Sequence, residues 1–157
     1  MREIYKNVNA NILTCSKTKI KGNCCSYQGV FDVTKAKKDG KTYRVHDFEV
    51  VLQLSILFYD DNDKDIVEFN KEYEGMLAIR HNDSDRCVII SNFDICFSKD
   101  NTFFDGRRNL CIIIRRTKVK GLKIPLGLGI YSIEFLMREK NRETEWDSQT
   151  VASLLIC

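Results

Sequence analysis

Apolar and polar side chains alternate with a period of two along much of this chain. The clearest case is the segment 45–59, whose even positions are apolar at Phe48, Val50, Leu52, Leu54, Ile56 and Phe58, and whose odd positions include Asp47, Glu49, Gln53 and Ser55. Successive side chains of an extended strand point to opposite faces, so this alternation predicts a long strand with one buried face. The turn-forming run 60–65 follows, and Ile66, Val67 and Phe69 then predict a return strand, so we expect a hairpin.

Further short apolar runs recur between clusters of turn residues. They cover residues 12–20, 26–33, 76–79, 87–97, 110–114, 130–137 and 151–156. No segment of a dozen residues keeps a clean helical period, although Ile66, Phe69 and Tyr73 leave room for one short helix at 64–74. Eight or nine strands cannot hide their apolar faces in one open sheet. The sequence therefore predicts an all-β fold, an antiparallel β-sandwich of two sheets.

Composition agrees with one globular domain over residues 1–157. The chain is 43% hydrophobic and contains a single Pro, which is unlike a disordered or linker-rich protein. It shows neither a secretory leader nor an apolar run of the roughly 20 residues that span a bilayer. We expect a soluble, cytoplasmic protein.

The net charge of +3 is small, so an anionic partner would have to meet a local patch. Between Gly106 and Ile133 there is no acidic residue, and seven cations surround the apolar run 110–114: Arg107, Arg108, Arg115, Arg116, Lys118, Lys120 and Lys123. In an extended strand Arg116, Lys118 and Lys120 share one face, and Arg115 lies on the other. These seven are the predicted partner-binding residues. The alternative is an edge strand whose charges only prevent aggregation.

A second basic cluster lies earlier in the chain. It combines Tyr43 with nearby cations, namely Lys35, Lys37, Lys38, Lys41 and Arg44. One aromatic side chain does not make a platform for stacking bases.

The segment from Asp60 to Glu74 is acidic and imitates the spacing of a calcium loop. However, Ile66 stands where the sharp turn of such a loop requires glycine. The sequence therefore favours a solvated hairpin tip, and a weak cation site is the alternative.

The seven cysteines do not suggest a disulfide framework or a zinc site, because their number is odd and no Cys-x-x-Cys pair is present. We expect reduced thiols. Cys87, Cys96 and Cys111 lie within apolar runs and are predicted to be buried, whereas Cys157 and one of the adjacent Cys24 and Cys25 should face water.

The sequence offers few candidate catalytic residues. The two histidines, His46 and His81, are not near any nucleophile or metalloprotease motif, so we interpret them as ordinary strand-end and loop residues. Trp146 is expected to cap the core. The sequence implies no cofactor.

Three segments carry a family resemblance. They are the strand end Gly29-Val30-Phe31-Asp32, the long strand from Phe48 to Tyr59, and Gly129-Ile130-Tyr131-Ser132-Ile133-Glu134-Phe135 before a terminal strand. In these the chain resembles small bacterial cytosolic β-sandwich domains of unknown function, although Arg44-Val45-His46-Asp47 stands where many relatives place a proline. The resemblance implies a compact binding or accessory module without catalytic residues.

We expect a non-catalytic, intracellular module that binds a protein partner through charged surface patches. The alternative is a nucleic-acid-binding protein, or a phage or mobile-element inhibitor of a host nucleic-acid-processing complex such as an anti-CRISPR.

Overall fold

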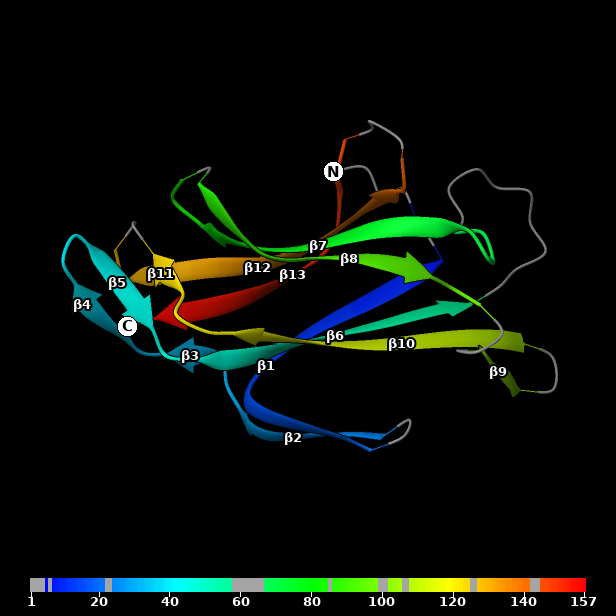
Figure 1. The fold of residues 1–157 in the computed structure, drawn as a ribbon, viewed down its shortest axis with the longest axis horizontal. Coiled ribbons are helices and arrows are strands. Elements are labelled where there is room, and N and C mark those ends of the chain that lie inside the picture. The colour runs from blue at the N-terminus through cyan, green and yellow to red at the C-terminus, as the bar shows by residue number, and fades with distance from the viewer. Residues whose placement is uncertain are drawn as a thin grey trace.

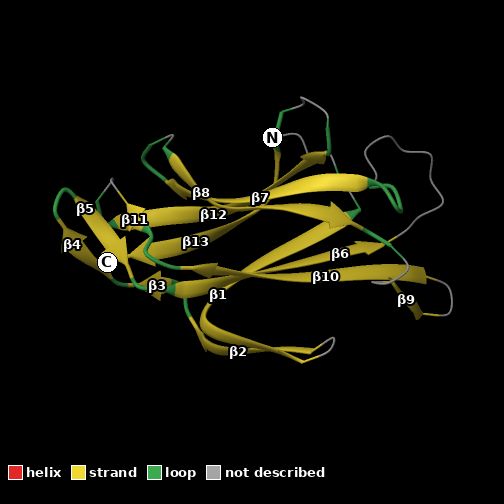
Figure 2. Ribbon diagram, in the orientation of Figure 1, coloured by secondary structure: helices red, strands yellow, loops and turns green. Residues whose placement is uncertain are grey.

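A computed structural model of the chain describes residues 5, 7–21, 24–57, 67–84, 86–98, 102–105, 108–124, 127–141 and 145–157. Within these residues every regular element is a strand, and Figure 2 shows no helix. The predicted all-β class is confirmed. The finer architecture differs from the expected two sheets of eight or nine strands, because the described residues form thirteen strands in three sheets.

The first five-stranded sheet has the order β2-β1-β6-β10-β9. Its strands are β1 (Val8–Lys21), β2 (Cys24–Val30), β6 (Phe48–Leu57), β9 (Thr102–Asp105) and β10 (Arg108–Val119). The first half of β1 pairs with β6 and the second half pairs with β2. Figure 1 shows this second half curling away with β2 below the rest of the sheet.

The second five-stranded sheet has the order β3-β13-β12-β7-β8. Its strands are β3 (Val33–Thr34), β7 (Glu72–His81), β8 (Cys87–Cys96), β12 (Gly129–Glu139) and β13 (Asp147–Ile156). The short β3 runs parallel to β13, so the expected purely antiparallel pairing is wrong at this edge.

A small third sheet closes one end of the molecule, at the left of Figure 1. It has the order β11-β5-β4 and is built from β4 (Ala36–Asp39), β5 (Thr42–Val45) and β11 (Lys123–Ile124). Strands of two to four residues are too short to show a hydrophobic period, which explains why the sequence predicted neither this sheet nor β3 and β9.

The two five-stranded sheets bury a common apolar core. The even positions of β6 from Phe48 to Ile56 supply one side of it, as the alternation predicted. The other side comes from inward-facing residues of β7, β12 and β13, among them Leu77, Phe135 and Leu154. Val51 and Glu49 of β6 are also buried, on the opposite face, so the strand is covered on both faces near its start.

The predicted hairpin between 45–59 and 66–69 is wrong. After β6 the chain crosses to the other sheet, since β6 pairs with β1 and β10, and the next strand that the structure describes, β7, pairs with β8 and β12. Residues 67–71 form no strand, and β7 begins only at Glu72, which also leaves no helix in the described part of 64–74. A local pattern shows which side chains are buried, but it does not show which strand pairs with which.

Candidate functional site

Strand β10 carries most of the predicted cations, and its register decides where they point. Arg116 and Lys118 stand opposite Val51 and Glu49 of β6, on the outer face of the sheet. Lys120 follows directly after the strand and is exposed, as are the other two. The alternation expected from the sequence is confirmed for this strand.

Arg115 faces the other way, as its parity predicted. It lies opposite Leu52, on the face that carries the core, and its guanidinium carbon lies 4.4 Å from the centre of the Phe93 ring on β8. A guanidinium over an aromatic face is attracted by the ring's quadrupole. Arg115 therefore bridges the two sheets at the side where β8 and β10 face each other, and it does not belong with the outer cations.

A second row of cations, which the sequence analysis missed, lies on the β1–β2 hairpin. Lys17, Lys19 and Lys21 alternate along β1 and are exposed, whereas Thr18 between them is only 5% exposed. Arg116 Nη1 donates a hydrogen bond to the Thr18 hydroxyl at 3.3 Å, which joins this hairpin to β10. The Lys-x-Lys-x-Lys spacing could have predicted this row, because lysines at every second position of a strand lie on the same face.

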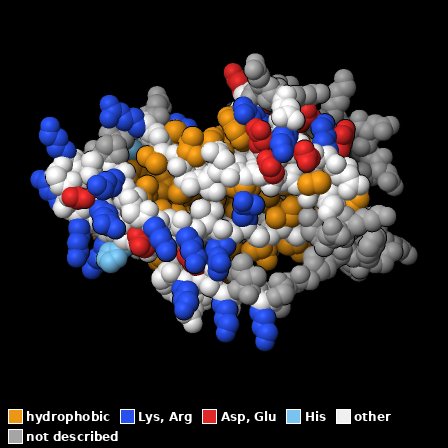
Figure 3. Space-filling view, in the orientation of Figure 1, with side chains coloured by type: hydrophobic (Ala, Val, Ile, Leu, Met, Phe, Trp, Pro, Cys, Tyr) orange, Lys and Arg blue, Asp and Glu red, His pale blue; other side chains and the backbone are white. Residues whose placement is uncertain are grey.

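We call these six side chains the basic face: Lys17, Lys19, Lys21, Arg116, Lys118 and Lys120. In Figure 3 blue side chains gather in two rows along the lower side of the molecule, over β10 and over the β1–β2 hairpin.

Cations of the second sheet and its flanking residues have acidic partners, whereas those of the basic face have none within the described part of the chain. On the second sheet, Arg138 pairs with Glu74 at 2.8 Å, Lys71 with Glu139 at 2.8 Å, and Lys140 with Asp94 at 3.1 Å. The hydrogen bond that the Lys71 ammonium donates to the Glu139 carboxylate raises the pKa of Lys71. Among the residues that the structure describes, no carboxylate forms an ion pair with any member of the basic face.

One carboxylate does lie beneath the basic face. Glu49 is paired in register with Lys118 but is only 8% exposed. Its Oε2 atom is buried and has no hydrogen-bond partner within the described part of the chain. It therefore adds no exposed acidic group to the basic face.

The remaining predicted partner-binding residues do not join this face. Lys123 lies in the third sheet, where it pairs with Asp39 at 3.4 Å. Arg107 lies outside the described residues, and only the backbone of Arg108, in β10, is described.

Most of the candidate calcium loop, residues 60–66, lies outside the described residues. Of the acidic residues that are described, Glu68 lies near Lys71, Glu72 near Lys140, and Glu74 is bound by Arg138. Within the described ranges, no group of three or more His, Cys, Asp or Glu side chains is arranged to hold a metal ion.

The two histidines lie in different settings. His81 packs edge-on against Tyr131, with ring centres 4.9 Å apart, and its Nδ1 accepts a hydrogen bond from the Asp83 amide at 3.3 Å. His46 is exposed and lines a hollow with Lys37, Arg44, Val45 and Asp47.

Trp146 does not cap the core as expected. It is half-buried, and the Arg138 guanidinium carbon lies 4.1 Å from its ring centre. Since Arg138 projects from the outer face of the second sheet, where it binds Glu74, the indole packs on that outer face instead.

The thiol predictions need a correction. Cys111 is buried as expected, but Cys87 and Cys96 are exposed. In β8 the inward positions near the end are Phe93 and Ile95, so Cys96 has outward parity, and Cys87 begins the strand at its exposed end. Cys157 is exposed, as expected, and Cys15 is buried. The side chains of Cys24 and Cys25 lie outside the described part of the chain.

Among the described residues there is no helix long and apolar enough to cross a membrane. Comparison with protein-family models, with curated proteins and with solved structures finds no match for this chain. The resemblance to small bacterial β-sandwich domains therefore stays a prediction.

Proposed function

We propose that this protein is a non-catalytic binding module whose basic face engages an acidic surface of a partner protein. The observation that carries the proposal is the contrast in charge pairing. The second sheet neutralises its own cations with nearby carboxylates, while the six cations of β1, of β10 and of the position directly after β10 have no ion pair among the described residues.

Holding like charges together on one surface costs free energy unless a partner or counterions compensate it. Here the strands fix the Cα positions of the six cations, and the Thr18–Arg116 hydrogen bond holds the two rows together. Such a surface accelerates association with an acidic partner and loses this advantage as salt shortens the screening length to about 8 Å at physiological ionic strength.

Nucleic acid is the second candidate, because phosphates would bind the same six cations. Tyr27 of β2 is 37% exposed, but it lies opposite Thr18 in the β1–β2 register and so projects from the face that Thr18 shares, away from the lysine row. We rank this function second, since the lysine row has no aromatic ring beside it in the β1–β2 register on which a base could stack.

The experiment compares two variants of equal net charge. The face variant carries Lys17→Glu, Lys19→Glu and Lys118→Glu, and the control variant carries Lys35→Glu, Lys38→Glu and Lys41→Glu, all at exposed positions. Each protein is immobilised and incubated with extract of the source cells, and bound proteins are quantified at rising salt. In parallel, gel shifts measure binding to single- and double-stranded DNA and RNA.

We expect one dominant protein to be retained by the wild type and the control variant, lost from the face variant, and released by salt. Nucleic-acid retardation with the same dependence on the face would establish the second candidate instead. Two results would exclude the basic face as the binding surface. In the first, both variants recover equal amounts of the partner protein. In the second, no protein is recovered above background and no nucleic acid is retarded in the gel.

A further inference from the structure

One edge of the first sheet lacks the charges and the proline that usually protect an edge strand. β2 ends the strand order and, within the described residues, pairs only with β1. Figure 1 shows it at the lower margin of the molecule. None of its residues is charged or a proline, and the side chains of residues 26–30 are exposed. An exposed edge offers unpaired N–H and C=O groups to a strand of another chain, so β2 is open to strand addition.

The other sheet edges in the described part of the chain are protected. A register shift interrupts the pairing of β8 with β7. The edge strands β3 and β11 have two residues each, and β4 and β9 have four each. Bulges and very short edge strands both hinder pairing with a further strand. Among the strands that the structure describes, β2 is therefore the edge best suited to accept one.

The lysine row, which consists of Lys17, Lys19 and Lys21, projects beside this edge. Lys17 is paired in register with Gln28, and Lys19 with Ser26, so these side chains share one face of the β1–β2 hairpin. The residues that line a hollow on this face are Lys17, Thr18, Lys19, Ser26 and Gln28. No carboxylate of the described residues lines it. The hollow thus connects the free edge of β2 to two lysines of the basic face.

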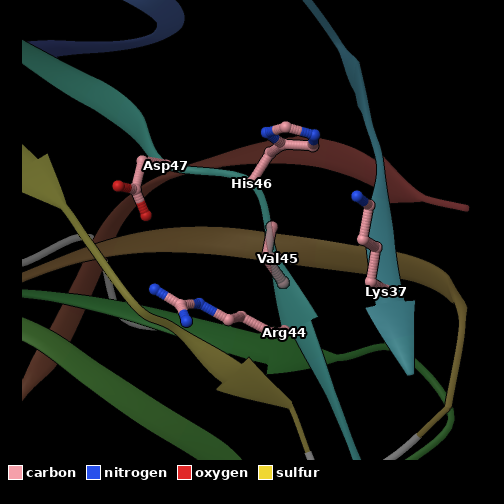
Figure 4. Close-up of a pocket in the computed structure, with 5 residues that line it drawn as sticks. All are labelled: Lys37, Arg44, Val45, His46 and Asp47. Carbon is pink, nitrogen blue, oxygen red and sulfur yellow. The ribbon is translucent and has the colours of Figure 1, made fainter. Parts of the chain in front are cut away.

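The cations of the third sheet offer no comparable row. Figure 4 shows the Lys37 side chain running toward the His46 ring, whereas the Arg44 side chain extends away from Lys37, on the side of Asp47. The Asp47 carboxylate also lines the hollow between these two cations. A carboxylate of a partner would approach a like charge there, so we use this sheet for the control variant.

We propose that the acidic partner docks as an extended strand on the free edge of β2, with carboxylates at every second position facing the lysine row. This inference rests on the proposed function, because it assigns a docking mode to part of the same basic face. Neighbouring strands lie about 4.8 Å apart, so a strand added to β2 lies about 10 Å from β1. Lysine and glutamate side chains that extend toward each other over β2 bridge such a distance. Main-chain hydrogen bonds would supply affinity, and the alternate side chains would supply specificity.

The opposite face of β2 specifies the residues between these carboxylates. Tyr27 is 37% exposed and projects from the face away from the lysine row. An added strand places its intervening side chains beside this ring, and aromatic rings pair favourably with β-branched side chains across strands. We therefore expect valine, isoleucine or threonine at these positions. A second copy of this chain fits the edge poorly, because its β2 would bring lysines to that face instead of carboxylates.

A synthetic peptide tests this docking mode on the full chain. The probe is Glu-Thr-Glu-Val-Glu-Thr-Glu, with both ends blocked, and the control peptide has the same composition in the order Glu-Glu-Glu-Glu-Thr-Val-Thr. Backbone amide signals are followed by NMR during each titration at constant ionic strength. We expect the alternating peptide to saturate with a dissociation constant on the order of 1 mM or below, and the block peptide to bind roughly tenfold more weakly. Every second amide of β2, which faces the free edge, should exchange its hydrogen more slowly in the complex.

A pair of variants checks the role of the lysine row. The double variant Lys17→Ala, Lys19→Ala should bind the alternating peptide at least tenfold more weakly. The double variant Lys37→Ala, Lys41→Ala removes the same charge from exposed positions of β4 and of the turn that follows it, and it should bind as the wild type does. Spectra of the free variants show that each remains folded.

Methylation of the peptide amides separates strand addition from simple attraction between charges. One alternating peptide carries N-methyl groups on its glutamates, and another carries them on the residues between. Because the amides of a strand point alternately to its two edges, only one of these two peptides should lose binding.

Three results would overturn the docking mode: no saturable binding of the alternating peptide, binding that both methylated peptides retain, and binding that leaves the β2 amides unprotected. If binding in the last two cases still depends on Lys17 and Lys19, the proposed function stands as a contact between charged surfaces without an added strand. Equal weakening by the two double variants would instead count against both the docking mode and the basic face.

Discussion

Arg116 and Thr18 lie 98 positions apart in the chain, and a hydrogen bond of 3.3 Å from the Arg116 guanidinium to the Thr18 hydroxyl joins them. Thr18 belongs to the half of β1 that has left β6 to pair with β2, and Arg116 projects from the outer face of β10. The contact therefore holds the curled hairpin to a strand with which it does not pair, and brings the two rows of the basic face together.

Replacing Thr18 by valine removes the hydroxyl and keeps the shape of the side chain. We expect a loss of about 1 kcal/mol in the free energy of unfolding, the usual net value of one hydrogen bond. Amides of the β1–β2 hairpin should also exchange their hydrogens faster, because the hairpin loses a contact with β10. Thr18→Ser keeps the hydroxyl and serves as the control. Wild-type exchange rates in Thr18→Val would show that the contact does not hold the hairpin.

Gly75 of β7 is expected to tolerate no side chain. A Cβ atom at this position would lie 2.5 Å from Cε2 of Phe93 and 2.8 Å from Cδ1 of Ile95, both in the buried core. Phe93 stacks on Phe135, with ring centres 6.1 Å apart, so it is not free to move aside. Gly75→Ala should therefore cost about 1–3 kcal/mol by overpacking, measured by chemical denaturation.

A double variant checks the cause of that loss. Phe93→Leu removes the ring that the new methyl group meets, so the Gly75→Ala and Phe93→Leu double variant should lose less stability than the sum of the two single changes. Strict additivity would mean that the clash with Phe93 is not the reason.

Native thiol labelling distinguishes the exposed cysteines from the buried ones. Cys87, Cys96 and Cys157 are exposed and should react with a mild alkylating reagent in the folded protein. Cys15 and Cys111 are buried and should react only after denaturation. Mass mapping of the labelled peptides measures both groups. Rapid native labelling of Cys111 would contradict the placement of β10 against the core.

Stability should fall in alkaline solution because of two tyrosines. Burial raises the pKa of Tyr73 and of Tyr131 above the ordinary value of 10.0. The folded state thus holds these protons more tightly than the unfolded state does. Their contribution is complete below pH 10.0 and is lost as the pH rises from there through the folded pKa.

Chemical denaturation at about pH 8 and about pH 11 measures this loss. Tyr73→Phe should lose less stability between the two pH values than the wild type. It should also be less stable at about pH 8, because the Tyr73 hydroxyl accepts a hydrogen bond of 2.8 Å from the Glu68 amide. An unchanged alkaline loss in Tyr73→Phe and in Tyr131→Phe would rule out these two groups as its source.

The alternation of apolar and polar residues was enough to predict the all-β class and the buried face of the long strands β6 and β10. The alternation in β6 predicted its inward residues from Phe48 to Ile56, and the alternation in β10 placed Arg116 and Arg115 on opposite faces. These features were readable because side-chain direction in a strand depends only on the parity of neighbouring residues. The Lys17, Lys19 and Lys21 row could have been found by the same rule.

The pairing of the strands, in contrast, could not be predicted from the sequence and became visible in the folded chain. The chain crosses between sheets after β6, three strands of two to four residues build the third sheet, and Lys37, Arg44 and Lys123 meet there from three separate segments. The same holds for the Arg116 contact with Thr18. Pairing between strands depends on the packing of the whole core and on contacts distant in the sequence, and no local pattern of hydrophobic residues encodes it.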